Sequence, residues 1–148
     1  MIKIPDDLAI KHLQSRLCKG DVLFWQDFPG VEQLRDSHFI ILTECISGEY
    51  IYVRATARVH LYYGPDAKRA QTDTLLLPKG TCTIFAKETM LDFKMISRFE
   101  VGELAKLLGT KLKIEGKLED SIIKQIESVI KSSKTIRQKD IDLILNSR

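Results

Sequence analysis

The segment that decides the fold is His38-Phe-Ile-Ile-Leu-Thr43, followed by Ser47-Gly48 and then by Tyr50-Ile-Tyr-Val-Arg-Ala-Thr56. The first run is almost continuously apolar, which predicts a central strand. The second run is rich in β-branched and aromatic residues, which also favour a strand. Because a Ser-Gly pair separates the two runs, we predict a hairpin turn there.

Further short strands are predicted on both sides of this hairpin. Residues 21–25 are rich in β-forming side chains and end at the turn signal Asp27-Phe28-Pro29-Gly30. Residues 56–63 are predicted to continue as an irregular or edge strand, before a polar loop that opens at 64–66 and places tyrosines 62 and 63 near Lys68 and Arg69. The remaining predicted strands are 74–77, 82–85 and 90–96. Short strands at this spacing, joined by Gly- and Pro-bearing turns, favour a compact barrel.

Helical patterns flank these strands. Pro5-Asp6-Asp7, with apolar residues at helical spacing behind it, predicts a short helix that ends near Lys19-Gly20. Two patterns typical of a capping box, Ser97-x-x-Glu100 and Thr135-x-x-Gln138, predict the starts of a short helix and of a last helix. Between them we predict a brief strand at 112–114 and an amphipathic helix at 118–130.

The chain is therefore interpreted as one domain over residues 1–148. It consists of an N-terminal helical extension at 1–18, a barrel with its closing helix at 19–132, and a C-terminal helical tail at 133–148. With 44% apolar and 29% charged residues, the composition is that of an ordinary globular protein. No apolar run approaches the roughly 20 residues of a membrane span, and the first residues do not resemble a secretory signal. We therefore expect a cytoplasmic protein that does not enter a membrane.

Charge and cysteine content restrict the chemistry. The net charge is +3, which permits nucleic-acid binding without arguing for it. Cys18, Cys45 and Cys82 lie far apart and form no C-x-x-C pair, so the sequence predicts neither a zinc site nor a disulfide framework. We expect no metal and no cofactor.

Several short motifs between residues 19 and 132 resemble the MazF/PemK toxin family. The opening Gly-Asp strand of the family is similar to Gly20-Asp21-Val-Leu-Phe-Trp25, and its Pro-Gly-x-Glu loop to Pro29-Gly30-Val31-Glu32. Its next apolar strand is similar to Phe39-Ile-Ile-Leu42, and Tyr52-Val-Arg-Ala-Thr56 resembles the strand that ends in the active-site threonine. Residues 89–93 and 118–130 are similar to a late strand and the closing helix. The resemblance implies an α+β, mainly β fold: a small SH3-like β-barrel of the MazF/PemK/CcdB type, with a short N-terminal helix and C-terminal helices.

The resemblance also implies a function. Members of this family cut single-stranded RNA without a metal ion, commonly form homodimers, and are neutralised by an antitoxin protein that fills the RNA groove. Carried over to this chain, Thr56 keeps the family's active-site position. The catalytic Arg-Pro pair of the family falls on Ser37-His38, and the nearest arginine is Arg35. The chain therefore departs from the family at its catalytic arginine.

Metal-free RNA cleavage needs a group that accepts the 2′-hydroxyl proton and a donor that stabilises charge on the phosphate. We predict His38 as the acid or base, because its ordinary pKa is about 6.5. Arg35 or Arg54 would bind the phosphate, and Thr56 would hydrogen-bond a nearby oxygen. The residues predicted to contact RNA are Arg54, Ser37, Glu32, Lys68 and Arg69.

Each of these residues also fits a structural role. His38 begins a buried strand, where histidine is often a hydrogen-bonding core residue, and Arg54 fits the solvent face of an alternating strand. Arg35 fits an ion pair with Asp36 or Glu32, and Thr56 fits a simple strand end. Three functions therefore stay open: an endoribonuclease-like toxin, a non-catalytic barrel that binds nucleic acid or a protein partner, or a purely structural or virion component.

Overall fold

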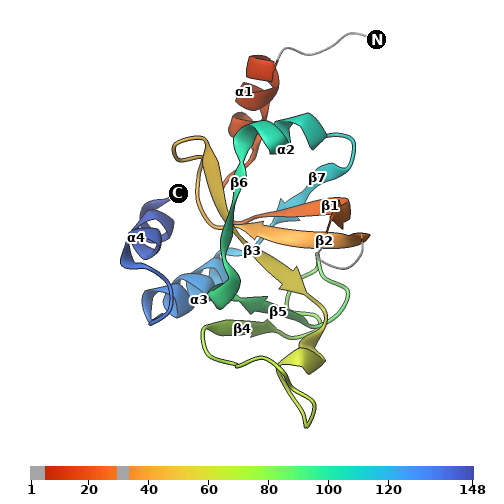
Figure 1. The fold of residues 1–148 in the computed structure, drawn as a ribbon, viewed down its shortest axis with the longest axis vertical. Coiled ribbons are helices and arrows are strands. Elements are labelled where there is room, and N and C mark those ends of the chain that lie inside the picture. The colour runs from red at the N-terminus through yellow and green to blue at the C-terminus, as the bar shows by residue number, and fades with distance from the viewer. Residues whose placement is uncertain (1–5, 30–33) are drawn as a thin grey trace.

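The computed structural model describes residues 6–29 and 34–148, which form an α+β fold (Figure 1). The elements follow one another in the order α1 (Asp6–Arg16), β1 (Asp21–Pro29), β2 (Leu34–Ile41), β3 (Glu49–Thr56), η1 (Val59–Leu61), β4 (Thr74–Leu77), β5 (Thr89–Asp92), η2 (Phe93–Met95), β6 (Ser97–Glu100), α2 (Val101–Leu107), β7 (Leu112–Lys117), α3 (Asp120–Lys131) and α4 (Gln138–Asn146). No helix in these described ranges is long and apolar enough to cross a membrane.

The described strands form one antiparallel sheet of seven strands, and β3 lies at its centre. One edge of β3 pairs with β2, while β6 pairs with the first half of the other edge and β5 with the end of it. The strands β1 and β7 continue the sheet beyond β2, and β4 continues it beyond β5. The predicted hairpin is confirmed, because Ile46 and Glu49 exchange backbone hydrogen bonds of 2.9 and 3.0 Å. Ser47 and Gly48 both have positive φ, as a two-residue type I′ turn requires.

The expected closed barrel is wrong. Within the described residues, the path of paired strands ends at β4 on one side and at β7 on the other. The strand predicted at 82–85 does not form, because these residues make a turn in which the Phe85 N–H donates to the Cys82 carbonyl at 3.3 Å. Cys82 and Phe85 are both buried in the core. Their apolar character therefore reflects a buried turn and not a further strand of the sheet.

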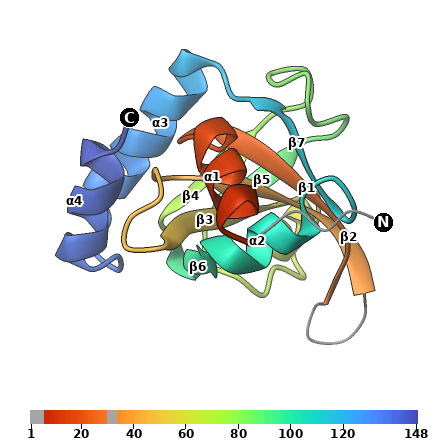
Figure 2. The same cartoon turned by 90° about the horizontal axis from the view of Figure 1, so that it is seen from above.

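Helices cover both faces of the sheet (Figures 1 and 2). On one face α1 and α2 pack over a cluster that includes Leu13, Leu23, Phe39, Ile41 and Leu104. On the other face α3 and α4 pack over a cluster that includes Val22, Ile40, Val53, Ile126 and Ile144. Successive residues of a strand point to opposite faces, so a strand that is covered on both sides is apolar at every position. This explains the continuous apolar run that marks β2 in the sequence.

The predicted helices at 118–130 and at the C-terminus are confirmed as α3 and α4, but both predicted capping boxes are wrong. Residues 97–100 form β6 and pair with β3, so α2 begins only at Val101. The hydroxyl of Thr135 donates to the Asp73 carboxylate and does not cap α4, which begins at Gln138. In each case a contact with a distant segment takes the side chain or the backbone that a local cap would use.

Two predicted strands were also too long. The irregular strand expected at 56–63 turns into η1 after β3 ends at Thr56. The strand expected at 90–96 stops at Asp92, and η2 begins at the next residue. The Asp92 carboxylate caps η2 by accepting the Lys94 N–H at 3.0 Å. Thr56 and Asp92, where these two strands end, both line the candidate site.

Candidate functional site

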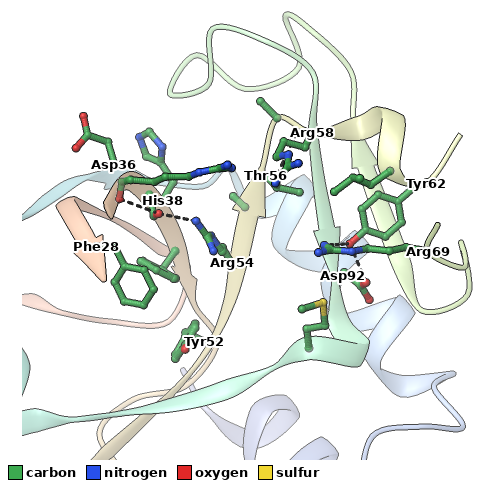
Figure 3. A pocket seen from close by; sticks show the side chains of 17 residues that line it. Phe28, Asp36, His38, Tyr52, Arg54, Thr56, Arg58, Tyr62, Arg69 and Asp92 are labelled. Atoms are coloured by element: carbon green, nitrogen blue, oxygen red, sulfur yellow. Dashed lines mark hydrogen bonds between the residues drawn. The ribbon is translucent and has the colours of Figure 1, made fainter. Parts of the chain in front are cut away.

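A pocket of about 460 Å³ lies where the beginning of β2 and the end of β3 meet the 57–73 segment, which connects β3 to β4 (Figure 3). The face of β3 that carries Tyr52, Arg54 and Thr56 forms part of its lining, and β2 adds Arg35 and Ser37. The 57–73 segment contributes the opposite wall. A space of this size is in the range that holds a drug-sized or nucleotide-sized molecule.

The aromatic side of the pocket depends on an irregularity in β1. One extra residue lies between Trp25 and Phe28 relative to β2, and Asp27 in this bulge has a positive φ of 54°. The bulge places Trp25 and Phe28 on the same face of the sheet, with their rings 4.9 Å apart. The Arg54 guanidinium lies over the Phe28 ring, 5.7 Å from its centroid. This contact is a cation–π interaction that holds the arginine against the floor of the pocket.

Arg54 is the electrostatic centre of the pocket. Its Nη2 donates to Ser37 Oγ at 2.8 Å, so the predicted RNA contact Ser37 is a buried partner of an arginine. Burial lowers the pKa of Arg54, and the positive charges of Arg35, Arg69 and Arg58 lower this pKa further. An arginine nevertheless stays charged at neutral pH. The pocket therefore gathers several cations that repel one another, which is the electrostatics of an anion site.

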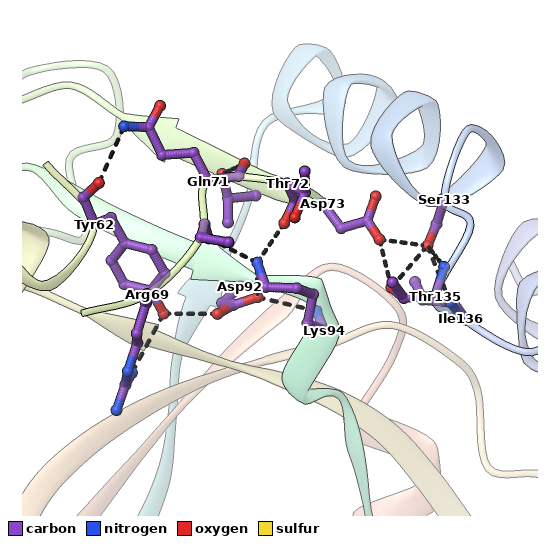
Figure 4. A network of polar contacts seen from close by, with 12 residues as sticks. Tyr62, Arg69, Gln71, Thr72, Asp73, Asp92, Lys94, Ser133, Thr135 and Ile136 are labelled. Carbon is purple, nitrogen blue, oxygen red and sulfur yellow. Dashed lines mark hydrogen bonds and ion pairs between the residues drawn. The ribbon is translucent and has the colours of Figure 1, made fainter. Parts of the chain in front are cut away.

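Tyr62 and Asp92 position Arg69. The Arg69 guanidinium lies 5.8 Å from the centroid of the Tyr62 ring, and its Nη1 donates to Tyr62 Oη at 3.3 Å. The Tyr62 hydroxyl in turn donates to Asp92 Oδ2 at 2.8 Å, and Lys94 Nζ pairs with Asp92 Oδ1 at 3.0 Å (Figure 4). Burial raises the pKa of Tyr62, so the hydroxyl keeps its proton at neutral pH. This network ties the 57–73 segment to the end of β5.

Thr56 and Arg58 occupy the point where β3 ends. The Thr56 hydroxyl oxygen accepts the Arg58 N–H at 3.1 Å, a local turn that redirects the chain. As a result Arg58 lines the pocket while it stays exposed to solvent. Within the described part of the chain, the Arg58 side chain makes no ion pair.

His38 borders the pocket, but its ring packs on the other face of the sheet from Arg54. The imidazole contacts Phe24 and Phe85, with ring centroids 5.1 and 5.4 Å away. Because residues 37 and 38 alternate along β2, Ser37 faces Arg54 and His38 faces the opposite way. Burial lowers the pKa of His38, so the ring is neutral at pH 7. The structure therefore does not bring the His38 imidazole onto the same face as the arginines.

The other predicted site residues divide into three groups. Those that line the pocket together are Arg35, Ser37, Arg54, Thr56 and Arg69. Lys68 is exposed on the 57–73 segment and does not line the pocket. Glu32 lies outside the described residues. The pocket residues that sequence reasoning missed include Phe28, Arg58, Tyr62 and Asp92, and only the placement of tyrosines beside cations at 62–69 carried any signal for them.

The arrangement is suited to binding an anion that also carries a planar ring. Guanidinium groups bind phosphate oxygens through paired hydrogen bonds, and aromatic side chains stack with bases. In residues 6–29 and 34–148, no group of three or more His, Cys, Asp or Glu side chains is placed to hold a metal ion. The sequence matches no protein-family model, and no curated protein matches it.

Proposed function

We propose that this protein binds single-stranded RNA through the arginine-lined pocket. The observation that carries the proposal is the convergence of four arginines from separate parts of the chain on one pocket. Arg35 comes from β2, Arg54 comes from β3, and Arg58 and Arg69 come from the 57–73 segment. Phosphate is the anion that RNA offers at every nucleotide, and arginine is the side chain that matches its geometry best.

Aromatic side chains make a single strand the better fit. Phe28 and Tyr52 line the pocket beside Arg54, and both residues are partly exposed. Stacking on an aromatic ring is open only to bases that are not already stacked inside a duplex. A pocket of about 460 Å³ also admits one nucleotide and not the width of a helix.

The resemblance to the MazF/PemK family supports RNA as the polymer. In this proposal the chain is a divergent relative whose SH3-like fold is open between β4 and β7. The homodimer and the antitoxin partner that the resemblance implies belong to the same proposal. An antitoxin segment with carboxylate side chains would compete with RNA for Arg54 and Arg69.

Metal-independent cleavage of the bound RNA is the second candidate function. It is favoured by Thr56, which lies in the pocket with Arg54. The resemblance assigns this residue to the position of the family's active-site threonine. A catalytic role for His38 requires its ring to reach RNA from the opposite face of β2. We therefore place binding first and cleavage second.

Binding is tested by fluorescence anisotropy with a short labelled RNA strand, in single-stranded form and annealed to its complement. We expect the single strand to bind more tightly, and Arg54→Gln to weaken its binding about tenfold, as the loss of a charged hydrogen bond to phosphate would. Lys124→Gln, which removes an exposed cation on α3, is the matched control and should leave the affinity unchanged. Equal losses in the two variants would reject the pocket as the binding site.

Cleavage is tested with a long single-stranded RNA in EDTA. If the protein is a ribonuclease with its site in the pocket, Thr56→Val and Arg54→Gln should both abolish the products. His38→Gln decides whether the imidazole takes part. Intact RNA after incubation with folded protein that binds it would reject the second candidate and leave a binding module.

A further inference from the structure

We infer that the pocket selects RNA strands that end in a phosphate monoester, so that it reads the end of a chain and not its interior. The inference rests on the proposed RNA binding and names the part of the RNA that the pocket takes. It follows from the balance of charge in the pocket, from the number of elements that supply its arginines, and from the fixed wall that the 57–73 segment forms.

The charge of the pocket exceeds what one internucleotide phosphate can neutralise. Among the residues that the structure describes, Arg54, Arg58 and Arg69 line it together with Arg35, and the lining carboxylates are Asp36 and Asp92. Asp92 is already paired with Lys94 and bound by the Tyr62 hydroxyl. Figure 3 shows the Asp36 side chain directed away from Arg54 and Arg69. A phosphodiester carries one negative charge, whereas a terminal phosphate monoester carries about 1.5 to 2 at pH 7.

The arginines also come from different sides. Arg54 is fixed on the floor by Ser37 and Phe28, and Arg69 reaches in from the opposite wall, where Tyr62 holds it (Figure 3). In an internucleotide phosphate two of the four oxygens are bound into the chain, so two remain as free acceptors. A terminal phosphate has three free oxygens. Donors on separate elements can therefore contact a terminal phosphate at the same time.

The 57–73 segment is held in place by contacts that do not depend on a ligand (Figure 4). The Gln71 side chain donates to the Tyr62 carbonyl at 3.0 Å, and Lys94 Nζ donates to the Ala70 carbonyl at 2.9 Å. The N–H groups of Lys68 and Arg69 both donate to the Leu61 carbonyl, at 3.0 and 2.9 Å. A strand end can enter a pocket with such a wall, whereas an RNA chain that continues in both directions has to leave past it.

Mutual repulsion among the arginines gives the same preference. Burial lowers the pKa of Arg54, and the nearby positive charges lower it further, so the cations that line the pocket repel one another. An anion relieves this repulsion, and a dianion relieves it more than a monoanion does. The preference should therefore depend on the second negative charge and on the arginines of the opposite wall, Arg58 and Arg69.

The test compares the affinities of one short RNA sequence with four ends: hydroxyl at both ends, 5′-phosphate, 3′-phosphate, and a terminal methyl phosphodiester. The last carries an additional phosphate but only one negative charge on it. We expect a phosphate monoester at one end to increase affinity about tenfold over hydroxyl ends, and the methyl diester to recover only a small part of this gain. The arm that gains affinity identifies whether the pocket reads the 5′ or the 3′ end.

The variants Arg58→Gln and Arg69→Gln should each reduce the preference for the phosphate end more than they reduce binding of the hydroxyl-ended strand. Lys68→Gln removes a neighbouring cation that does not line the pocket, and it should retain the preference. Equal affinity of all four RNAs for wild-type protein would overturn the inference while the proposed RNA binding stands. Failure of every RNA to bind would reject both.

Discussion

The basic residues of two regions, Lys19 beside the C-terminal helices and the arginines of the pocket, have opposite surroundings. Beside the C-terminal helices, the buried amine of Lys19 donates to the carbonyls of Ile144 and Ser147 at 2.7 and 3.2 Å and pairs with Glu127 at 3.3 Å. In the pocket, by contrast, burial lowers the pKa of Arg54, and the positive charges of Arg35, Arg69 and Arg58 lower it further. Lys19 is paired with oxygen acceptors of the protein, whereas the arginines of the pocket lie close to other positive charges.

We propose that the difference separates a structural cation from cations that bind a ligand. A buried charge persists only when acceptors from the protein replace the water it has lost, and Lys19 has such acceptors at the end of α4. The mutual repulsion of cations around a pocket does not stabilise the empty protein. Their arrangement is useful when an anion enters, because binding then stabilises the folded state. The following predictions test this separation.

Lys19→Met should have the largest effect. It removes the donor that satisfies two carbonyls at the end of α4 and leaves Glu127 without its partner. We expect the free energy of unfolding to fall by about 2–4 kcal/mol, measured by urea denaturation. Lys124→Met on the exposed face of α3 is the control. A loss below about 0.5 kcal/mol, which is the range of ordinary surface substitutions, would show that Lys19 has no structural role.

Tyr62→Phe should affect both stability and RNA binding, because Tyr62 joins the pocket to the core. The variant leaves Asp92 Oδ2 without the hydroxyl that donates to it and leaves Arg69 without one of its contacts. We expect the free energy of unfolding to fall by about 1–2 kcal/mol, together with weaker RNA binding. Tyr63→Phe, at the neighbouring exposed tyrosine, provides the comparison in both assays. Unchanged RNA affinity would mean that the tyrosine does not position Arg69.

Arg58→Gln should affect RNA binding but not stability. We expect a several-fold loss of RNA affinity, as for one charged hydrogen bond to phosphate, with a change in the free energy of unfolding below about 0.5 kcal/mol. Titrations at two salt concentrations should also show a smaller salt dependence than in the wild type, because one phosphate contact is lost. A destabilised variant with full RNA affinity would show that Arg58 is a structural residue and does not bind RNA.

His38→Gln tests whether the histidine belongs to the pocket or to the core, and it should have the smallest effect near neutral pH. Because the pKa of His38 is lowered in the folded protein, the unfolded chain binds the proton more readily. The wild type should therefore lose stability as the pH falls below about 6.5, the ordinary pKa of histidine, and this loss should be smaller in the variant. Urea denaturation at pH 7 and pH 5 measures the difference, and RNA affinity at pH 7 should be unchanged.

Local sequence patterns predicted the elements whose signals are local. The Ser47-Gly48 hairpin, the N-terminal helix and the amphipathic helix α3 all appear where turn residues, helix-start signals and periodicity place them. The candidate site was predicted in part. Thr56, Arg54, Arg35 and Arg69 do line one pocket, but the ring of His38 faces away from Arg54. The strand at 82–85 and the closed barrel were wrong because buried turns and buried strands have the same apolar composition.

The sequence by itself therefore determined the central strands β1 to β3, the hairpin turn and the apolar face of α3, because each depends on residues within a few positions of one another. Only the tertiary structure decided which side chains share a pocket. The bulge at Asp27 directs Phe28 toward Arg54, and the contact of Tyr62 with Asp92 brings Arg69 to the end of β3. These contacts join residues that are far apart in the chain, and the pairing register of strands decides them. A shift of that register by one residue turns every following side chain to the other face, as the bulge at Asp27 does for Phe28.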